Sequence, residues 1–115
     1  MILTLPWPPK ACNPNARNHW TKLSVAKRRL RDMWFISARN QGAGRLDALH
    51  LTISLQFVPP DRRRRDMDNM LASCKAGMDG LSDLFGVDDS RWLLRLSIAP
   101  DPVKGGAVRV EVTPA

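Results

Sequence analysis

The segment PDRRRRDMDNM, residues 60–70, sets two kinds of charged side chain next to each other. Four arginines, Arg62 to Arg65, are followed at once by Asp66 and Asp68. Arginine can grip a phosphate with two parallel hydrogen bonds, and carboxylate oxygens are the hard ligands that magnesium and manganese prefer. The segment therefore predicts a site that holds a polyanion beside a divalent metal ion.

The helix expected after the arginines would extend this site. At about 100° per residue, Asp68, Lys75 and Asp79 fall in one stripe beside the apolar face. Asp66 lies just before or at the helix start, where an extended backbone could point its side chain the same way. Lys75 could then neutralise the charge that develops on a phosphorane, or protonate a leaving oxygen.

A further acidic pair, Asp88 and Asp89, lies in a predicted turn between this helix and a strand. The turn could bring one of these carboxylates back toward the helix, so that three aspartates from two loops converge on one ion. A magnesium ion held there, for which manganese can substitute, would lower the pKa of a bound water and stabilise a phosphodiester transition state.

Each of these features also has an ordinary structural explanation. An aspartate at a helix start is often a cap, and Lys75 and Asp79 have the i, i+4 spacing of a surface ion pair. Asp88 and Asp89 before Ser90 are common turn residues, and an arginine run is usually a solvated basic patch. Only the adjacency of these signals favours a nuclease over a binding protein.

The charge balance points to a polyanionic partner. The 115 residues include 18 Lys and Arg against 11 Asp and Glu, which gives a net charge of +7. Arginine outnumbers lysine 13 to 5, which favours nucleic acid because the guanidinium fork fits phosphate. Ten of the eleven acids are aspartates, whose short side chains suit caps and metal sites.

Several protein classes are excluded by composition. No stretch approaches the roughly 20 apolar residues of a membrane span, so no membrane partner is expected. The N-terminus lacks the basic and apolar regions of a signal peptide, so the expected location is the cytoplasm. Cys12 and Cys74 are too few for a disulfide framework, and we expect free thiols, with Cys74 in the core.

Hydrophobic periodicity predicts a single domain, residues 1–115, of the α+β (α/β) class. A small mixed sheet of about four strands packs with two main helices in the order β-α-β-α-β-β. The predicted strands are 2–5, 49–58, 92–99 and 107–113, and the predicted helices are 21–41 and 66–84. The polar loop NPNARNHW before the first helix suits contact with DNA or a partner subunit. The predicted DNA contacts are Arg17, His19, Arg62, Arg63, Arg64, Arg65 and Asn69.

The motifs LPWPP and PDRRRRDMDN, the Lys-x-x-x-Asp pair and the DD before a strand together resemble the RusA-like Holliday junction resolvases. The resemblance implies a homodimer that binds branched DNA, the four-way junction, and makes paired symmetric incisions with magnesium. It assigns catalytic and metal-binding roles to Asp66, Asp68 and the Asp88–Asp89 pair, with Asp89 preferred. The family lysine maps onto Lys75.

The position of the lysine departs from the family pattern. In the family the lysine falls four residues after the second aspartate of the motif, where this chain has Ala72. Lys75 lies three residues later, and nearly one helical turn returns it to the same side.

Three functions are compatible with the sequence. The first is a magnesium-dependent, structure-selective endodeoxyribonuclease that resolves Holliday junctions in DNA recombination and repair, of phage or prophage origin. The second is a non-catalytic DNA-binding phage accessory or regulatory protein that uses the aspartates as caps. The third is a nuclease acting on RNA or unbranched DNA.

Overall fold

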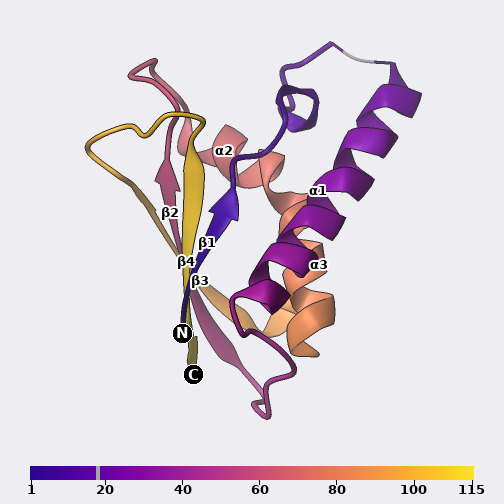
Figure 1. Ribbon diagram of the computed structural model, residues 1–115, viewed down its shortest axis with the longest axis vertical. Coiled ribbons are helices and arrows are strands. Elements are labelled where there is room, and N and C mark those ends of the chain that lie inside the picture. Colours follow the sequence, from indigo (N-terminus) through magenta and orange to yellow (C-terminus); the bar gives the residue numbers. More distant parts are fainter. Residues whose placement is uncertain (18) are drawn as a thin grey trace.

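The computed structural model describes residues 1–17 and 19–115, so Asn18 of the predicted polar loop lies outside the described residues. The described chain forms one four-stranded sheet with its helices gathered on one face (Figure 1). The elements are β1 (Ile2–Pro6), α1 (Trp20–Asn40), β2 (Leu51–Val58), α2 (Met67–Ser73), α3 (Lys75–Phe85), β3 (Trp92–Ile98) and β4 (Ala107–Pro114), with short 3-10 helices at Lys10–Cys12 and Asp89–Arg91. The predicted fold class is confirmed, and so is the element order, except that two helices, α2 and α3, stand between β2 and β3 where one was predicted.

The sheet has the strand order β1-β4-β2-β3. β4 runs antiparallel to both of its neighbours, β1 and β2, whereas β2 and β3 are parallel. Parallel neighbours need a long crossover connection. Here α2 and α3 form that crossover, so the arginine run lies between β2 and α2, and the 3-10 helix that begins at Asp89 immediately precedes β3.

The core lies between the sheet and the helices. The alternating residues of β2, Leu51, Ile53, Leu55 and Phe57, are at most 1% exposed. They face a cluster that includes Trp34 of α1, which is fully buried. The period-two pattern of β2 therefore buries the face that the sequence predicts.

The α1 and α3 helices approach closely because α3 carries glycines at their contact. A methyl group on Gly77 would collide with the Trp34 ring, and one on Gly80 would collide with the carbonyl oxygen of Arg31. At the edge of this contact, Arg31 forms an ion pair with Asp83. The contact fixes α3, and therefore Lys75 at its first turn, against the rest of the molecule.

The prediction of one continuous helix over residues 66–84 is wrong at its middle. The helix is interrupted at Cys74, where the backbone (φ −94°, ψ −2°) ends α2 and begins α3. The Ser73 hydroxyl donates to the carbonyl oxygen of Asn69 at 2.8 Å, a back-bond that often bends helices. Cys74 is fully buried, and both it and Cys12 are free thiols, as predicted. Among the described residues, no helix has the length and apolar character needed to cross a membrane.

Candidate active site

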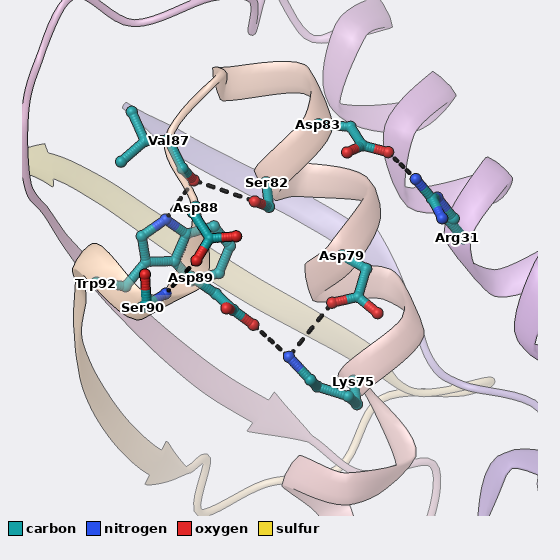
Figure 2. Close-up of polar contacts among 10 residues, drawn as sticks. All are labelled: Arg31, Lys75, Asp79, Ser82, Asp83, Val87, Asp88, Asp89, Ser90 and Trp92. Atoms are coloured by element: carbon teal, nitrogen blue, oxygen red, sulfur yellow. Dashed lines mark hydrogen bonds and ion pairs between the residues drawn. The ribbon is translucent and has the colours of Figure 1, made fainter.

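A cavity of about 540 Å³ lies beside the first turns of α2 and α3. We call it the lysine cavity. Lys75 donates to the carboxylate of Asp89, and its Nζ lies 3.3 Å from Oδ1 of Asp79, so one ammonium joins two acids (Figure 2). Asp68 lines the same cavity, as does a second cation, Lys27. The site thus gathers three carboxylates and two ammonium groups from separate elements.

Asp89 is positioned by a turn that is fixed to its neighbours. The carbonyl oxygen of the buried residue Val87 accepts from the Ser82 hydroxyl at 3.1 Å and from the Trp92 indole at 3.0 Å (Figure 2). These bonds tie the turn to α3 on one side and to β3 on the other. Gly86 adopts the left-handed conformation (φ 70°) that ends α3 and makes this short turn possible. The carboxylate of Asp89 is therefore held over Lys75 by secondary structure on both sides.

Asp88 and Asp89 have different roles in this turn. Asp88 caps the 3-10 helix by accepting from the Ser90 N–H at 3.0 Å. Hydrogen bonds from the Ser90 side chain and backbone lower the pKa of Asp88 below its ordinary value. Asp88 matches the ordinary turn explanation, whereas Asp89 lines the lysine cavity. The geometry thus favours Asp89 of the two.

The electrostatics of the lysine cavity keep Lys75 protonated. The hydrogen bond to Asp89 raises the pKa of Lys75, partial burial opposes it, and Asp79 adds to the rise. An ammonium with a raised pKa is a poor general base at neutral pH. It can stabilise a developing negative charge or donate a proton.

A second cavity, of about 650 Å³, opens between the N-terminal loop and the arginine run. We call it the loop cleft. Arg63, Arg64, Arg65 and Asp66 line one side, together with Asn69 from the first turn of α2. The N-terminal loop contributes Trp7, Pro8, Pro9, Lys10, Asn13, Asn15 and Ala16 to the lining.

The four arginines of the run have different environments. Arg62 pairs with Asp101 at 3.2 Å, and the Arg63 Nε lies 3.9 Å from Asp61. Arg65 is the most buried of the four, since its side chain is 21% exposed. Among the described residues, Arg64 has no ion-pair partner, which leaves its guanidinium to the cleft. The assignment of all four arginines to DNA stays a prediction.

Arg65 is held by contacts within the run and the N-terminal loop. Its Nη1 donates to the Asp61 carboxylate at 2.8 Å and to the carbonyl oxygens of Asp61 and Arg63. Its guanidinium also lies over the Trp7 ring, 5.7 Å from the centroid. Asp61 and Trp7 are site residues that were not predicted from the sequence. The i, i+4 spacing of Asp61 and Arg65 and the LPWPP motif are the signals that could have found them.

The two aspartates of the DMDN motif lie at different cavities. Asp66 precedes α2 at the N-cap position and lines the loop cleft, whereas Asp68 lines the lysine cavity. The expectation that they point the same way is therefore not met. The side chain of Asp66 makes no capping hydrogen bond with any described residue, which counts against the simple cap.

Within residues 1–17 and 19–115, no three His, Cys, Asp or Glu residues form a group that could hold a metal ion. Lys75 already joins two of the carboxylates that the sequence assigns to this region. The donor chemistry nevertheless fits magnesium, which is commonly held by one or two carboxylates, waters and substrate phosphate. Asp68 and Asp89 provide two such carboxylates in one cavity.

Two further predicted DNA contacts lie near the start of α1. His19 is the N-cap of α1, and its Nδ1 accepts from the Thr21 N–H at 3.3 Å. Arg17 is exposed in the loop before it. The structural explanation of His19 is thus present in the molecule, and contact of either residue with DNA stays a prediction.

Comparison with known proteins gives a consistent set of relatives, although no family model matches the chain. An uncharacterized protein of Xylella fastidiosa is 39% identical over 119 residues, covering 96% of this chain and 74% of that protein. The crossover junction endodeoxyribonuclease RusA of Enterobacteria phage 82 is 32% identical over 116 residues. The protein of the same name from Escherichia coli K12 is 30% identical over 113 residues. Each of these two matches covers 96% of this chain and 92% of the relative.

Proposed function

The chain belongs to the RusA family of crossover junction endodeoxyribonucleases, and on this premise we propose that it resolves four-way DNA junctions by magnesium-dependent, paired symmetric nicks. One observation carries the proposal. Lys75 is held between Asp79 and Asp89 in a cavity that Asp68 also lines. An ordinary surface loop of aspartates does not need an ammonium fixed between them. Phosphodiester hydrolysis uses both kinds of group, carboxylates to bind a metal ion and a cation to stabilise the developing negative charge.

Asp68 and Asp89 would hold the metal ion. Both are carboxylates, both line the lysine cavity, and Asp89 is fixed by the Val87 turn. When bound, magnesium supplies a more acidic water and stabilises charge on the scissile phosphate. The third aspartate implied by the resemblance, Asp66, lies at the neighbouring loop cleft. Its part in metal binding stays a prediction.

Lys75 would stabilise the leaving side of the reaction. Its raised pKa keeps it charged at neutral pH, so it can hydrogen-bond to a phosphoryl oxygen as negative charge develops there. Asp79 and Asp89 hold the ammonium in place before DNA arrives. This arrangement supports the assignment of the family lysine to Lys75 in spite of its shift along the sequence.

The charge of the chain and the symmetry of the substrate support a dimer on branched DNA. A four-way junction has approximate two-fold symmetry, and its resolution needs two nicks, so two sites related by a two-fold axis fit it. Two copies at +7 each carry about +14, which favours strong, salt-sensitive binding. The similarity to a protein of Enterobacteria phage 82 supports a phage or prophage origin and a role in DNA recombination and repair.

The test is cleavage of an end-labelled four-way junction beside a linear duplex of the same sequence, with magnesium and with chelator. The wild type should make paired nicks in opposite arms only with magnesium. Asp68→Asn should bind the junction as tightly as the wild type and lose at least about a hundredfold in cleavage rate. Asp47→Asn removes an exposed carboxylate that lines neither cavity, and it should cleave normally.

The alternatives give different results in the same assay. A non-catalytic DNA-binding protein would bind the junction without nicking it under any metal, and Asp68→Asn would change nothing. A nuclease without junction selectivity would cut the linear duplex, or a matched RNA, as fast as the junction. Either result would overturn the proposal.

A further inference from the structure

The loop cleft has the composition of a nucleotide site rather than of a backbone groove. We propose that it takes one unpaired nucleotide of DNA, with the base inserted and its phosphate at Arg63 and Arg64. The inference rests on the proposed function, because it names the part of a branched substrate that this chain would recognise. The cleft is separate from the lysine cavity, although Ser73 of α2 lines both.

The floor of the cleft is apolar. Its accessible apolar surface comes from Trp7, Pro9 and Pro60, which are partly exposed, and the buried residues Phe57, Met70 and Cys74 also line the cleft. A groove that only follows the sugar-phosphate backbone has less use for such a surface, since the phosphate is charged and the deoxyribose carries polar oxygens. A base has flat apolar faces, and an apolar slot stabilises a base only after it has left the stack.

The rim of the cleft is cationic. Arg64 has no ion-pair partner among the described residues, and Lys10 stands at the N-terminal side of the same opening. The Arg63 side chain is 82% exposed, and its distance of 3.9 Å to Asp61 is too long for a strong pair. These cations can therefore bind a phosphate without breaking a well-formed ion pair. The positive charge at the rim matches the phosphate of a nucleotide, and the apolar surface of the cleft matches its base.

Three amide side chains, Asn13, Asn15 and Asn69, also line the cleft. Asn13 uses its Oδ1 to accept the Asn15 N–H at 2.9 Å, which shapes the loop and leaves its amide N–H groups for other partners. In the described part of the chain, no hydrogen bond engages the side-chain amides of Asn15 and Asn69. An amide offers both a donor and an acceptor, the combination that base edges recognise. The cleft can therefore read a base as well as hold it.

The walls of the cleft are fixed without any ligand. Trp7 is packed under the Arg65 guanidinium on one side, and a methyl group on Gly106 would lie 2.9 Å from its Cγ on the other. The Trp34 indole donates to the carbonyl oxygen of Pro6 at 2.9 Å, which anchors the chain just before Trp7 to α1. A preformed slot loses little freedom on binding, as a recognition site requires.

The test compares two DNA duplexes that differ by one base. One carries a single bulged thymidine and the other a bulged abasic residue, and binding of the full chain is measured by fluorescence anisotropy with chelator present. The wild type should bind the bulged thymidine about tenfold more tightly than the abasic residue. Asn15→Ala combined with Asn69→Ala should reduce that ratio to about threefold or less. Asn40→Ala removes an amide at the end of α1, outside the loop cleft, and should preserve the ratio.

A second probe does not depend on the variants. With 2-aminopurine as the bulged base, its fluorescence should change on binding to the wild type when the base enters the apolar slot. Equal affinity for the thymidine and abasic duplexes, or full preference in the double variant, would overturn the inference. Junction cleavage with magnesium is scored separately. Cleavage without base preference refutes only the nucleotide site, and base preference without cleavage refutes only the nuclease.

Discussion

The lysine cavity and the loop cleft lie on either side of α2 and are built by different means. In the lysine cavity, helices and a hydrogen-bonded turn hold Lys75 against Asp79 and Asp89. The loop cleft is formed largely by two irregular segments, with cations and amides that have few partners. Side chains on rigid elements can be placed precisely enough for chemistry, whereas loops suit recognition. The difference separates a site that would cut DNA from one that would select it.

The short helix α2 contributes residues to both cavities. Asp66 and Asp68 are two residues apart, yet the first lines the loop cleft and the second lines the lysine cavity. Ser73, at the other end of the helix, lines both. A nucleotide bound at one side of α2 would therefore lie one helix away from the carboxylates on the other side. If both proposals hold, the DMDN motif would connect recognition to cleavage.

The largest expected effect comes from Lys75, because it is central to the lysine cavity and absent from the loop cleft. Lys75→Met should lower the rate of junction cleavage by about 10²- to 10³-fold, since it removes a fixed donor to developing charge. Junction affinity, measured with chelator, should stay within about twofold of the wild type. Single-turnover cleavage beside an equilibrium binding titration measures both.

Lys27→Met is the matched control for this substitution. Lys27 also lines the lysine cavity, but it comes from α1 and forms no ion pair with a described residue. Its loss should cost far less in cleavage rate than the loss of Lys75. If the two variants cleave alike, or if Lys75→Met mainly weakens binding, the separation between a cutting cavity and a selecting cleft fails.

Much of the fold could be predicted from the sequence because the buried residues recur at the regular spacings of strands and helices. The alternation of Leu51, Ile53, Leu55 and Phe57 predicts a strand with one buried face, and this is confirmed. The break at Cys74 could not be predicted, since no glycine or proline stands there. It depends on the Ser73 back-bond and on the packing of α3 against α1, and packing is a tertiary effect.

The candidate site could be predicted only in part. The sequence places Asp89 in a turn that could return to the helix, and the structure brings it to Lys75. The choice of Asp89 over Asp88 depends on the Val87 carbonyl bonds, which link residues of different elements. The loop cleft was not predicted, because its two sides are more than forty residues apart in the sequence.

A smaller effect is expected from the cationic rim of the loop cleft. Arg63→Ala combined with Arg64→Ala should weaken junction binding and reduce the slope of log affinity against log salt by about two per protomer, roughly 0.9 for each lost phosphate contact. Cleavage at saturating protein should change little. Affinities at four or more salt concentrations give the slope.

Arg28→Ala combined with Arg29→Ala removes the same charge from α1 and controls for net charge. These two residues lie outside both cavities. The α1 double variant should leave the slope nearly unchanged. Equal flattening by both double variants would mean that overall charge, and not the loop cleft, contacts the phosphates.

The smallest expected effect concerns the ion pair between Arg65 and Asp61, and the pKa of the Asp61 carboxyl group reports on it. The hydrogen bond from Arg65, followed by that from the Arg63 N–H, lowers the pKa of Asp61 from 3.8 to about 2. Because the pKa is lower in the folded chain, the stabilisation is present above about pH 4 and is lost as the pH falls toward 2. Titration of the Asp61 carboxyl carbon by NMR should show a midpoint near 2 in the wild type.

Arg65→Ala should return this midpoint toward 3.8, since the largest cause of the shift is removed. Arg62→Ala should leave it unchanged, because Arg62 pairs with Asp101 and not with Asp61. A wild-type midpoint near 3.8 would show that Arg65 does not hold the run against Asp61 in solution. Its guanidinium would then be as available to DNA as those of Arg63 and Arg64, and the loop cleft would lose the fixed wall on which its difference from a solvated basic patch depends.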